Sequence, residues 1–163
     1  MRKADIIEKK IFTLPELLRR IAQWRAIGKT VSFTNGVFDI MHRGHIASLS
    51  QAAGEADYLI VGLNSDASTK RLKGDSRPVN DEQARSIVMA ALLMVDAVVL
   101  FEEDTPLELI KAVLPDVLVK GGDYTEEQIV GAKEVKANGG KVVINPIVDG
   151  FSTTGLIGKI NKL

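Results

Sequence analysis

The chain has 163 residues, 45% of them hydrophobic and 26% charged, as expected for one globular domain with its own core. Its 21 basic and 21 acidic residues give a formal net charge of zero, which argues against a broad surface for nucleic acid. It has no cysteine, which excludes disulfides and thiolate metal sites and fits a reducing compartment. Because no apolar run is long enough to span a membrane and the start lacks a signal peptide, we expect a cytoplasmic protein without membrane contact.

In chain order, helical patterns alternate with short apolar strands. A polar lead-in precedes a helix over residues 13–27, which Thr13 caps and Gly28 ends, and we expect this helix to cover the domain. β-Branched, apolar runs predict strands over residues 30–34, 58–63, 97–101, 116–120 and 141–145. Helical spacing predicts further helices over residues 43–55, 81–94, 105–114, 126–138 and 152–161, the first burying Ile46, Leu49 and Ala53.

Near-continuous apolar strands that alternate with helices indicate a parallel sheet covered on both faces. We therefore predict a single α/β domain over residues 1–163, a Rossmann-like open sheet of five parallel strands. In such sheets ligands bind beyond the carboxyl ends of the strands. Three polar stretches follow predicted strand ends, at residues 34–36, 64–66 and 120–123. The pattern thus places a site at this edge.

The chain's only two histidines lie at the predicted turn from the first strand into the next helix. His42 and His45 are three residues apart, so on a helix they share a face. A helix start also offers free backbone N–H groups to an anion, and Gly36 and Gly44 allow a ligand to approach closely. The arrangement predicts a phosphate site. A zinc site is disfavoured because the chain has no cysteine and no third ligand nearby.

A basic segment follows the second predicted strand. It contains Lys70, Arg71, Lys73 and Arg77, and we expect a loop or frayed helix that closes over phosphates, the alternative being a solvated face. Three hydroxyls over residues 152–154 can cradle a phosphate or supply an ordinary helix cap.

Two aspartates have open roles. Asp123 follows two glycines, and its position fits an ordinary turn residue as well as it fits a residue of the site. Asp39 can hold a divalent metal or brace its turn by accepting backbone N–H groups, and bracing is favoured. Together, the candidate residues suggest phosphoryl or nucleotidyl transfer without a covalent nucleophile, in which positioning and charge stabilisation supply the catalysis.

The run Gly-x-Phe-Asp-x-x-His-x-Gly-His over residues 36–45 resembles the signature of the cytidylyltransferase-like nucleotidyltransferase superfamily. Residues 63–74, 76–80, 101–106, 119–124 and 150–154 are similar to one branch of it, the adenylyltransferases that make ADP-heptose from D-glycero-β-D-manno-heptose 1-phosphate and ATP for the lipopolysaccharide inner core. In many bacteria this domain follows a sugar kinase. Because no kinase-sized segment precedes it here, the resemblance implies the stand-alone form.

The resemblance also implies roles for individual residues. Catalytic roles fall to His42, His45 and Lys73. Nucleotide and phosphate binding falls to Thr34, Asn35, Gly36, Phe38, Lys70, Arg71, Arg85, Gly121, Ser152 and Thr153. Substrate binding falls to Asp39, Arg77, Lys120 and Asp123. ATP is the implied nucleotide with Mg²⁺, a sugar 1-phosphate the implied acceptor, and a homo-oligomer, dimer or larger, the implied assembly.

The chain departs from the family pattern at three positions. Phe151 replaces a small residue, Gly155 replaces a polar one, and Ile147 stands where glycerol-phosphate cytidylyltransferases have an arginine. The last difference counts against a cytidylyl enzyme. Alternatives that stay open are transfer to another phosphorylated acceptor (glycerol 3-phosphate, a coenzyme precursor, or α-heptose 1-phosphate with GTP) and a nucleotide-binding module without turnover.

Overall fold

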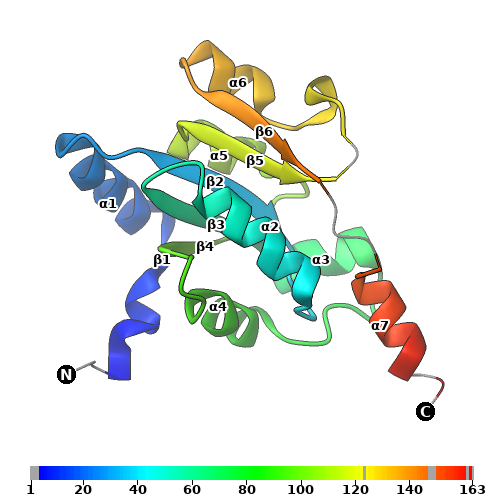
Figure 1. Cartoon of the computed structure of the whole chain (residues 1–163). Helices are drawn as coiled ribbons and strands as arrows, with labels where there is room; N and C mark the ends of the chain where they lie inside the picture. Colours follow the sequence, from blue (N-terminus) through cyan, green and yellow to red (C-terminus); the bar gives the residue numbers. More distant parts are fainter. Residues whose placement is uncertain (1–3, 123, 147–149, 161, 163) are drawn as a thin grey trace.

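The computed structural model describes residues 4–122, 124–146, 150–160 and 162. Over these residues the strands form one parallel sheet in the order β1-β4-β3-β2-β5-β6 (Figure 1). The strands are β1 Ile11–Phe12, β2 Val31–Gly36, β3 Tyr58–Asn64, β4 Ala97–Phe101, β5 Val117–Gly121 and β6 Lys141–Asn145. The α/β class and the five predicted strands are confirmed.

The prediction of five strands was one short, because β1 is a sixth. It lies in the polar lead-in and pairs with β4, Ile11 opposite Val98 and Phe12 opposite Val99. A strand of two residues is too short to show the alternation of apolar and polar residues that identifies strands in a sequence. Strand β1 forms because the edge of β4 is otherwise unpaired.

The helices are α1 Leu14–Ala26, α2 Arg43–Ala53, α3 Asp66–Lys73, α4 Glu82–Ala90, α5 Leu107–Val113, α6 Ala132–Ala137 and α7 Thr153–Ile160, with 3₁₀ turns η1 Ala4–Ile6, η2 Glu8–Lys10 and η3 Glu126–Gln128. The single helix predicted over residues 126–138 is therefore wrong, since it divides into η3 and α6. The division falls at Gly131, whose φ is +87° and where a Cβ would lie 2.8 Å from the Ile110 side chain.

Two apolar clusters hold the layers together. On one face α1, α5 and α6 pack against side chains such as Phe33 and Ile60, and on the other α2 and α4 pack against Leu59 and Val61 (Figure 1). In α2 the prediction was partly wrong, because Leu49 and Ala52 are buried while Ile46 is 37% exposed.

The covering helix α1 begins and ends near its predicted bounds. Thr13 and Glu16 form a capping box, with the Thr13 hydroxyl 2.6 Å from the Glu16 carboxylate. Leu17, Ile21 and Trp24 are its buried face, and the Trp24 ring stacks on Tyr58 with centroids 4.1 Å apart. This packing fixes α1 on the sheet.

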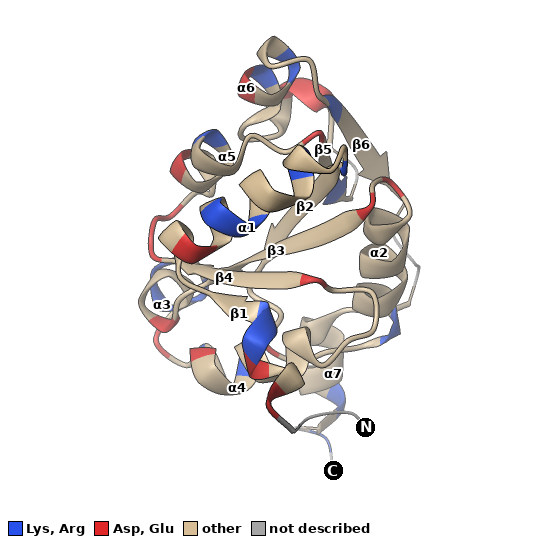
Figure 2. Cartoon of the chain, turned by 90° about the vertical axis from the view of Figure 1, so that its left-hand side faces the viewer, with Lys and Arg blue, Asp and Glu red and all other residues tan. Residues whose placement is uncertain are grey.

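Aspartates bind the backbone where strands begin. The carboxylate of Asp116 accepts from Val31 N–H at 2.8 Å, and that of Asp96 accepts from Leu59 N–H at 2.8 Å. Figure 2 shows acidic residues at the turns that enter β3 and β4. These contacts satisfy N–H groups that the sheet leaves unpaired at its amino-terminal edge.

At the opposite edge, the strand order reverses between β2 and β5. The strand arrows in Figure 1 point toward the side where α3 and α7 lie, and α2 begins there as well. A reversal of strand order opens a crevice at the carboxyl ends. The polar stretches after β2, β3 and β5 therefore meet where a ligand is expected.

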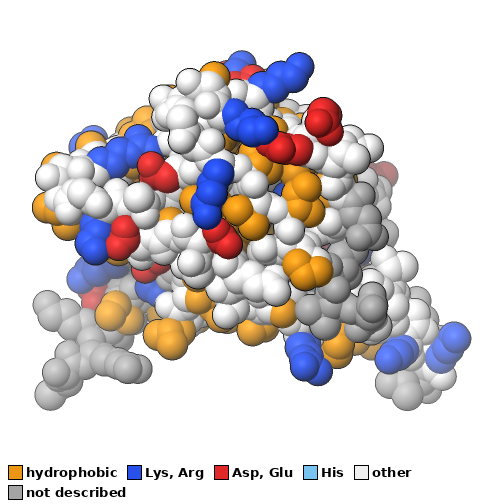
Figure 3. All heavy atoms as spheres, turned by 45° about the horizontal axis from the view of Figure 1, so that its top comes forward, with side chains coloured by type: hydrophobic (Ala, Val, Ile, Leu, Met, Phe, Trp, Pro, Cys, Tyr) orange, Lys and Arg blue, Asp and Glu red, His pale blue; other side chains and the backbone are white. Residues whose placement is uncertain are grey.

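The face shown in Figure 3 has no large patch of a single charge, because Lys and Arg are interspersed with Asp and Glu. This distribution agrees with the net charge of zero. Among the described residues, no helix combines the length and the apolar character that crossing a membrane requires.

Candidate active site

Two stacked imidazoles form the centre of the site. His42 is the N-cap of α2 and His45 lies in its first turn, with ring centroids 3.8 Å apart and planes 20° apart. The Nδ1 atoms of both rings are buried and have no hydrogen-bond partner among the described residues. Burial, and to a smaller extent the neighbouring His42, lowers the pKa of His45 to about 4. At neutral pH His45 is thus an uncharged donor.

Two glycines let the rings approach. A Cβ on Gly36 would lie 2.9 Å from the Phe38 ring, and a Cβ on Gly44 would lie 3.1 Å from the His42 ring. Phe38 has a φ of +47° and turns its ring edge-on to His45, with centroids 5.3 Å apart. The special status given to both glycines from the sequence therefore has a packing cause.

Asp39 braces the segment over residues 77–80. Its carboxylate accepts from Arg77 Nε at 2.6 Å and from the backbone N–H groups of Val79 and Asn80 at 2.8 Å. Burial alone would raise the pKa of Asp39, but the two N–H groups and the guanidinium outweigh it and hold the pKa below its usual value. These contacts show Asp39 in the bracing role that the sequence favoured over metal binding. The segment it braces is distant in sequence and is not its own turn.

These contacts affect two expectations. Arg77 is committed to Asp39, so the structure does not present it as a free ligand for substrate. The described residues contain no group of three His, Asp or Glu side chains placed to hold a metal ion, and Asp39 itself is engaged by protein donors. The alternative of a metal at Asp39 is therefore not supported.

Arg85 is the largest fully buried side chain. Its guanidinium donates to the carbonyls of Val37, Asn64 and Asn80 at 2.7 to 3.0 Å, and to the Asp66 carboxylate at 2.7 Å. It joins the ends of β2 and β3 to the start of α3. We assign it a bracing role and leave it out of the proposed nucleotide contacts.

Of the two expected forms, a loop or a frayed helix, the basic segment takes the helical one over α3, and Arg77 lies beyond the end of that helix. Ser65 caps α3 by accepting from Ser68 N–H at 3.1 Å. On this helix Arg71 pairs with Asp104 at 2.6 Å, while Lys70 and Lys73 are exposed. Within the described part of the chain, no contact joins these lysines to the histidines, so their phosphate role stays a prediction.

A pocket of about 210 Å³ lies at the reversal point between β2 and β5. Lys120 Nζ donates to Asn35 Oδ1 at 3.3 Å inside it, and burial lowers the pKa of Lys120. Its wall is otherwise mostly apolar, formed by Pro106, Leu118, Tyr124, Gln128, Ile129 and Val130. Asp123, expected beside Lys120, lies outside the described residues, as does Ile147.

Other predicted residues pack around this edge. Thr34 is buried in β2, and Gly121 ends β5 where a Cβ would lie 3.1 Å from Ser48 Oγ of α2. Ser152 accepts from Gly155 N–H at 3.0 Å, which is the ordinary capping role. Thr153 Oγ1 donates to Ile40 O at 3.3 Å, so α7 is tied to the turn that precedes the histidines.

One residue at the site was missed. Phe151 drew notice only as a departure from the family pattern, yet its ring lies 6.4 Å from that of His42, centroid to centroid. Its place directly before Ser152 is the only sequence signal that could have identified it.

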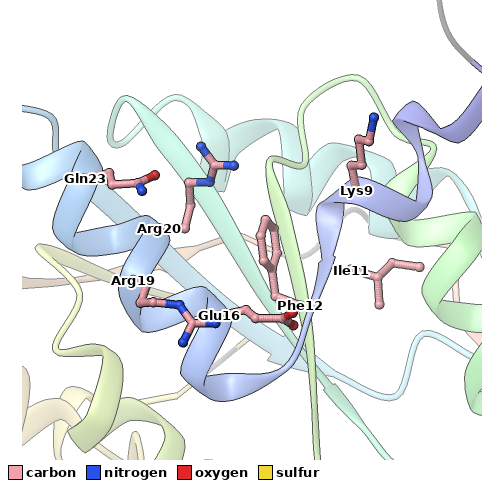
Figure 4. A pocket seen from close by; sticks show the side chains of 7 residues that line it. All are labelled: Lys9, Ile11, Phe12, Glu16, Arg19, Arg20 and Gln23. Carbon is pink, nitrogen blue, oxygen red and sulfur yellow. The ribbon is translucent and has the colours of Figure 1, made fainter.

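A hollow larger than the pocket at the reversal point lies elsewhere on the molecule. About 340 Å³ lies between the η2–β1 segment and α1, lined by Lys9, Ile11, Phe12, Glu16, Arg19, Arg20 and Gln23 (Figure 4). In Figure 4 Arg20, Gln23 and Lys9 extend to the same side, around the Phe12 ring. All but Ile11 and Phe12 are exposed, and none belongs to the predicted site. We therefore place the chemistry at the histidines and not in this hollow.

A family model described as cytidylyltransferase-like matches residues 33–156, more than half of the chain. The chain is 58% identical over 155 residues to the bifunctional protein HldE of Rhodopseudomonas palustris strain BisB5, covering 95% of this chain and 32% of that protein. It is 58% identical over 142 residues to the bifunctional protein HldE of Mesorhizobium japonicum, covering 87% and 29%. The chain thus spans about a third of the length of these relatives.

Two solved structures are similar. The lipopolysaccharide core biosynthesis protein from Thermoplasma volcanium has a TM-score of 0.60 and 30% identity, covering 74% of this chain and 98% of that one. Pantoate-beta-alanine ligase from Francisella tularensis has a TM-score of 0.51 and 16% identity, covering 88% and 76%, and this likeness concerns the fold alone.

Proposed function

The chain belongs to the cytidylyltransferase-like family, and from this membership we propose that it transfers an adenylyl group from ATP to D-glycero-β-D-manno-heptose 1-phosphate. The products are ADP-heptose and pyrophosphate, for synthesis of the lipopolysaccharide inner core. The observation that carries the proposal is the stacked pair His42 and His45 at the start of α2. The likeness to HldE and to a lipopolysaccharide core biosynthesis protein supports the choice of acceptor.

In the proposed reaction, a phosphate oxygen of the sugar 1-phosphate attacks the α-phosphorus of ATP. The bond from that phosphorus to the oxygen bridging to the β-phosphate breaks, and pyrophosphate leaves with the electron pair. Because the second pKa of a phosphate monoester is near 6, the attacking oxygen is already ionised at neutral pH. No general base is required, and among the described residues no carboxylate is hydrogen-bonded to Nδ1 of either histidine.

The histidines supply donors where charge develops. Both rings lie at a helix N-terminus, where the backbone N–H groups also favour an anion. His45 is neutral at pH 7 because its pKa is about 4, so it donates a hydrogen bond without adding charge. Donors positioned in advance stabilise the transition state at no cost of reorganisation.

The remaining groups position the two substrates. The pocket of about 210 Å³ at the reversal point contains the Lys120 amine and the Asn35 amide, which would bind the sugar phosphate or the nucleoside. The exposed Lys70 and Lys73 on α3 would extend to the β- and γ-phosphates as point charges. The hydroxyl of Ser152 and the backbone at Gly121 would complete the enclosure.

The family implies Mg²⁺ with ATP, and the described residues do not form a site for it. They contain no set of three acidic or histidine ligands, and the Asp39 oxygens are taken by Arg77, Val79 and Asn80. Mg²⁺ is commonly held by substrate phosphates with only one or two carboxylates. We derive no step through the metal.

Two wider properties follow from the same proposal. The protein would act in the cytoplasm, where ATP is available, and the absence of cysteine fits that compartment. It would form a dimer or larger homo-oligomer. The exposed apolar side chains Ile87, Val88 and Leu93, the last 94% exposed, support self-association near α4. Light scattering across protein concentrations tests the assembly.

The decisive experiment is pyrophosphate release with Mg²⁺, each of the four nucleotides, and the α and β heptose 1-phosphates. We expect release with ATP and the β sugar only. Release with GTP and the α sugar, or with glycerol 3-phosphate or a coenzyme precursor, would reject β-heptose 1-phosphate as the acceptor. It would still support nucleotidyl transfer as the reaction. Nucleotide binding without release from any pair would identify a binding module.

A further inference from the structure

Phe151 reaches the histidine pair from the carboxyl-terminal segment. Its ring lies 6.4 Å from that of His42, centroid to centroid, with 27° between the planes. The guanidinium carbon of Arg43 lies 5.7 Å from the centroid of the Phe151 ring, within the range of a cation–π contact. Phe151 is an exposed apolar residue, with 38% of its surface accessible to solvent.

The backbone of α2 is shaped for this contact. A Cβ on Gly44 would lie 3.3 Å from Phe151 Cβ and 3.1 Å from the His42 ring. A side chain at this position would therefore require the His42 ring and the Cβ of Phe151 to shift by a few tenths of an ångström. Thr153, two residues along, adds a hydrogen bond to Ile40 O and joins the same two segments.

His42 depends on packing for its orientation. A functional imidazole is usually oriented by a hydrogen bond at the nitrogen that does not act on the ligand. The His42 Nδ1 atom is buried and has no such partner among the described residues. Two aromatic rings lie beside the His42 ring. The centroid of the His45 ring is 3.8 Å from that of His42, and the centroid of the Phe151 ring is 6.4 Å away. Stacked and offset aromatic pairs have preferred geometries that can replace the missing hydrogen bond.

We propose that Phe151 is a positioning residue that holds the His42 ring in the orientation needed to donate to the transferring phosphate. Through Phe151, the docking of α7 sets the geometry of the pair at the start of α2. This role rests on the proposed adenylyl transfer. A small residue at this position could not stack on His42.

The test compares Phe151→Ala, which removes the ring, with Phe151→Tyr, which keeps it. Ile160→Ala is the matched control, because Ile160 ends α7, the helix that follows Phe151, is 61% exposed, and is far along the chain from the pair. We expect Phe151→Ala to lower kcat about tenfold while KM for ATP changes less than about twofold, since a misplaced donor affects the transition state more than substrate binding. Phe151→Tyr should retain activity, and Ile160→Ala should match the parent chain.

A second measurement does not depend on turnover. Ring-proton resonances of His42, recorded without substrate, should shift in Phe151→Ala because the ring current of Phe151 is lost, and should return toward their original positions in Phe151→Tyr. Unmoved His42 resonances would overturn the proposal, as would a full kcat in Phe151→Ala or an equal loss in Ile160→Ala. If the parent chain releases no pyrophosphate with any combination of nucleotide and acceptor, the proposed function fails. The His42 resonances alone then show whether Phe151 positions the His42 ring.

Discussion

Asp39 and Arg77, 38 positions apart in sequence, form an ion pair of 2.6 Å in which only 1% of the Asp39 side chain and 15% of the Arg77 side chain are exposed. With the N–H groups of Val79 and Asn80, this contact fastens the turn before the histidines to the segment that leads into α4. The turn is thereby held in place before any ligand binds.

Replacing Asp39 with Asn should destabilise the fold by about 3 kcal/mol at pH 7, because Arg77 and two N–H donors lose a buried charged acceptor. Urea unfolding measures the change. Asp104→Asn is the matched control, since Asp104 pairs with Arg71 but its side chain is 63% exposed, and less than about 1 kcal/mol is expected there. Because the pKa of Asp39 is depressed in the folded state, its contribution is present above about pH 4 and is lost as pH falls through the folded pKa. Equal losses in the two variants would contradict the bracing role.

His42→Gln should lower kcat about a hundredfold with KM for ATP nearly unchanged, because the donor acts mainly on charge that develops in the transition state. Pyrophosphate release under saturating and limiting ATP separates the two constants. A raised KM with full kcat would instead assign the ring to ground-state binding. Unfolding by urea should show that the variant is folded.

His45 should not titrate between pH 5 and 8, because its pKa is about 4. In the unfolded chain a histidine has a pKa near 6.5, so the unfolded state binds the proton first as pH falls. Stability should therefore decrease from about pH 6.5 toward pH 4, and His45→Gln should lessen that decrease. Histidine NMR titration and unfolding at several pH values measure both effects. A His45 resonance that titrates near pH 6.5 would refute the lowered pKa.

Arg85→Lys should cost about 3 kcal/mol of stability, because a lysine ammonium cannot reach the acceptors that the buried guanidinium joins. Arg71→Lys is the control on the exposed helix α3 and should change stability by less than about 1 kcal/mol. Thermal unfolding at fixed pH compares them. If Arg85→Lys keeps its stability but loses ATP binding, the nucleotide contact would be favoured over bracing.

Lys73→Ala should raise KM for ATP and lower kcat, each about fivefold, because one charge-assisted contact to a phosphate is worth about 2 kcal/mol. Lys111→Ala, on the exposed face of α5, removes a similar charge away from the site and should change neither constant. Hydrogen exchange over residues 68–77 should slow when ATP is added. Unchanged exchange and unchanged kinetics would remove the basic helix from the site.

Most of the architecture could be predicted because apolar strands and helix caps are local signals. Thr13 and Asp81 stand at predicted helix starts where capping residues belong, and both are N-caps in the structure. Two features escaped because they depend on distant partners. Strand β1 exists only beside β4, and the break at Gly131 is required by the approach of Ile110.

At the site, the histidines and glycines could be identified because their spacing along one turn already brings them together. Arginine roles could not be predicted in this way. Arg77 follows the basic segment and Arg85 lies in a predicted helix, and only the fold shows that Asp39, Asp66 and backbone carbonyls engage them. A guanidinium serves an anionic ligand and a buried carboxylate equally well, so its residue type does not distinguish the two.

The aspartates at the strand starts have a consequence for how this domain can change. Asp116 and Asp96 fasten the entries to β2 and β3, so the alignment of the sheet is secured at the edge away from the ligand. At the opposite edge Arg85 joins the ends of β2 and β3 through the carbonyls of Val37 and Asn64, and the side chains of Asn35 and Lys120 line the pocket there. A domain built in this way can acquire a new acceptor by altering one rim while the other preserves the fold.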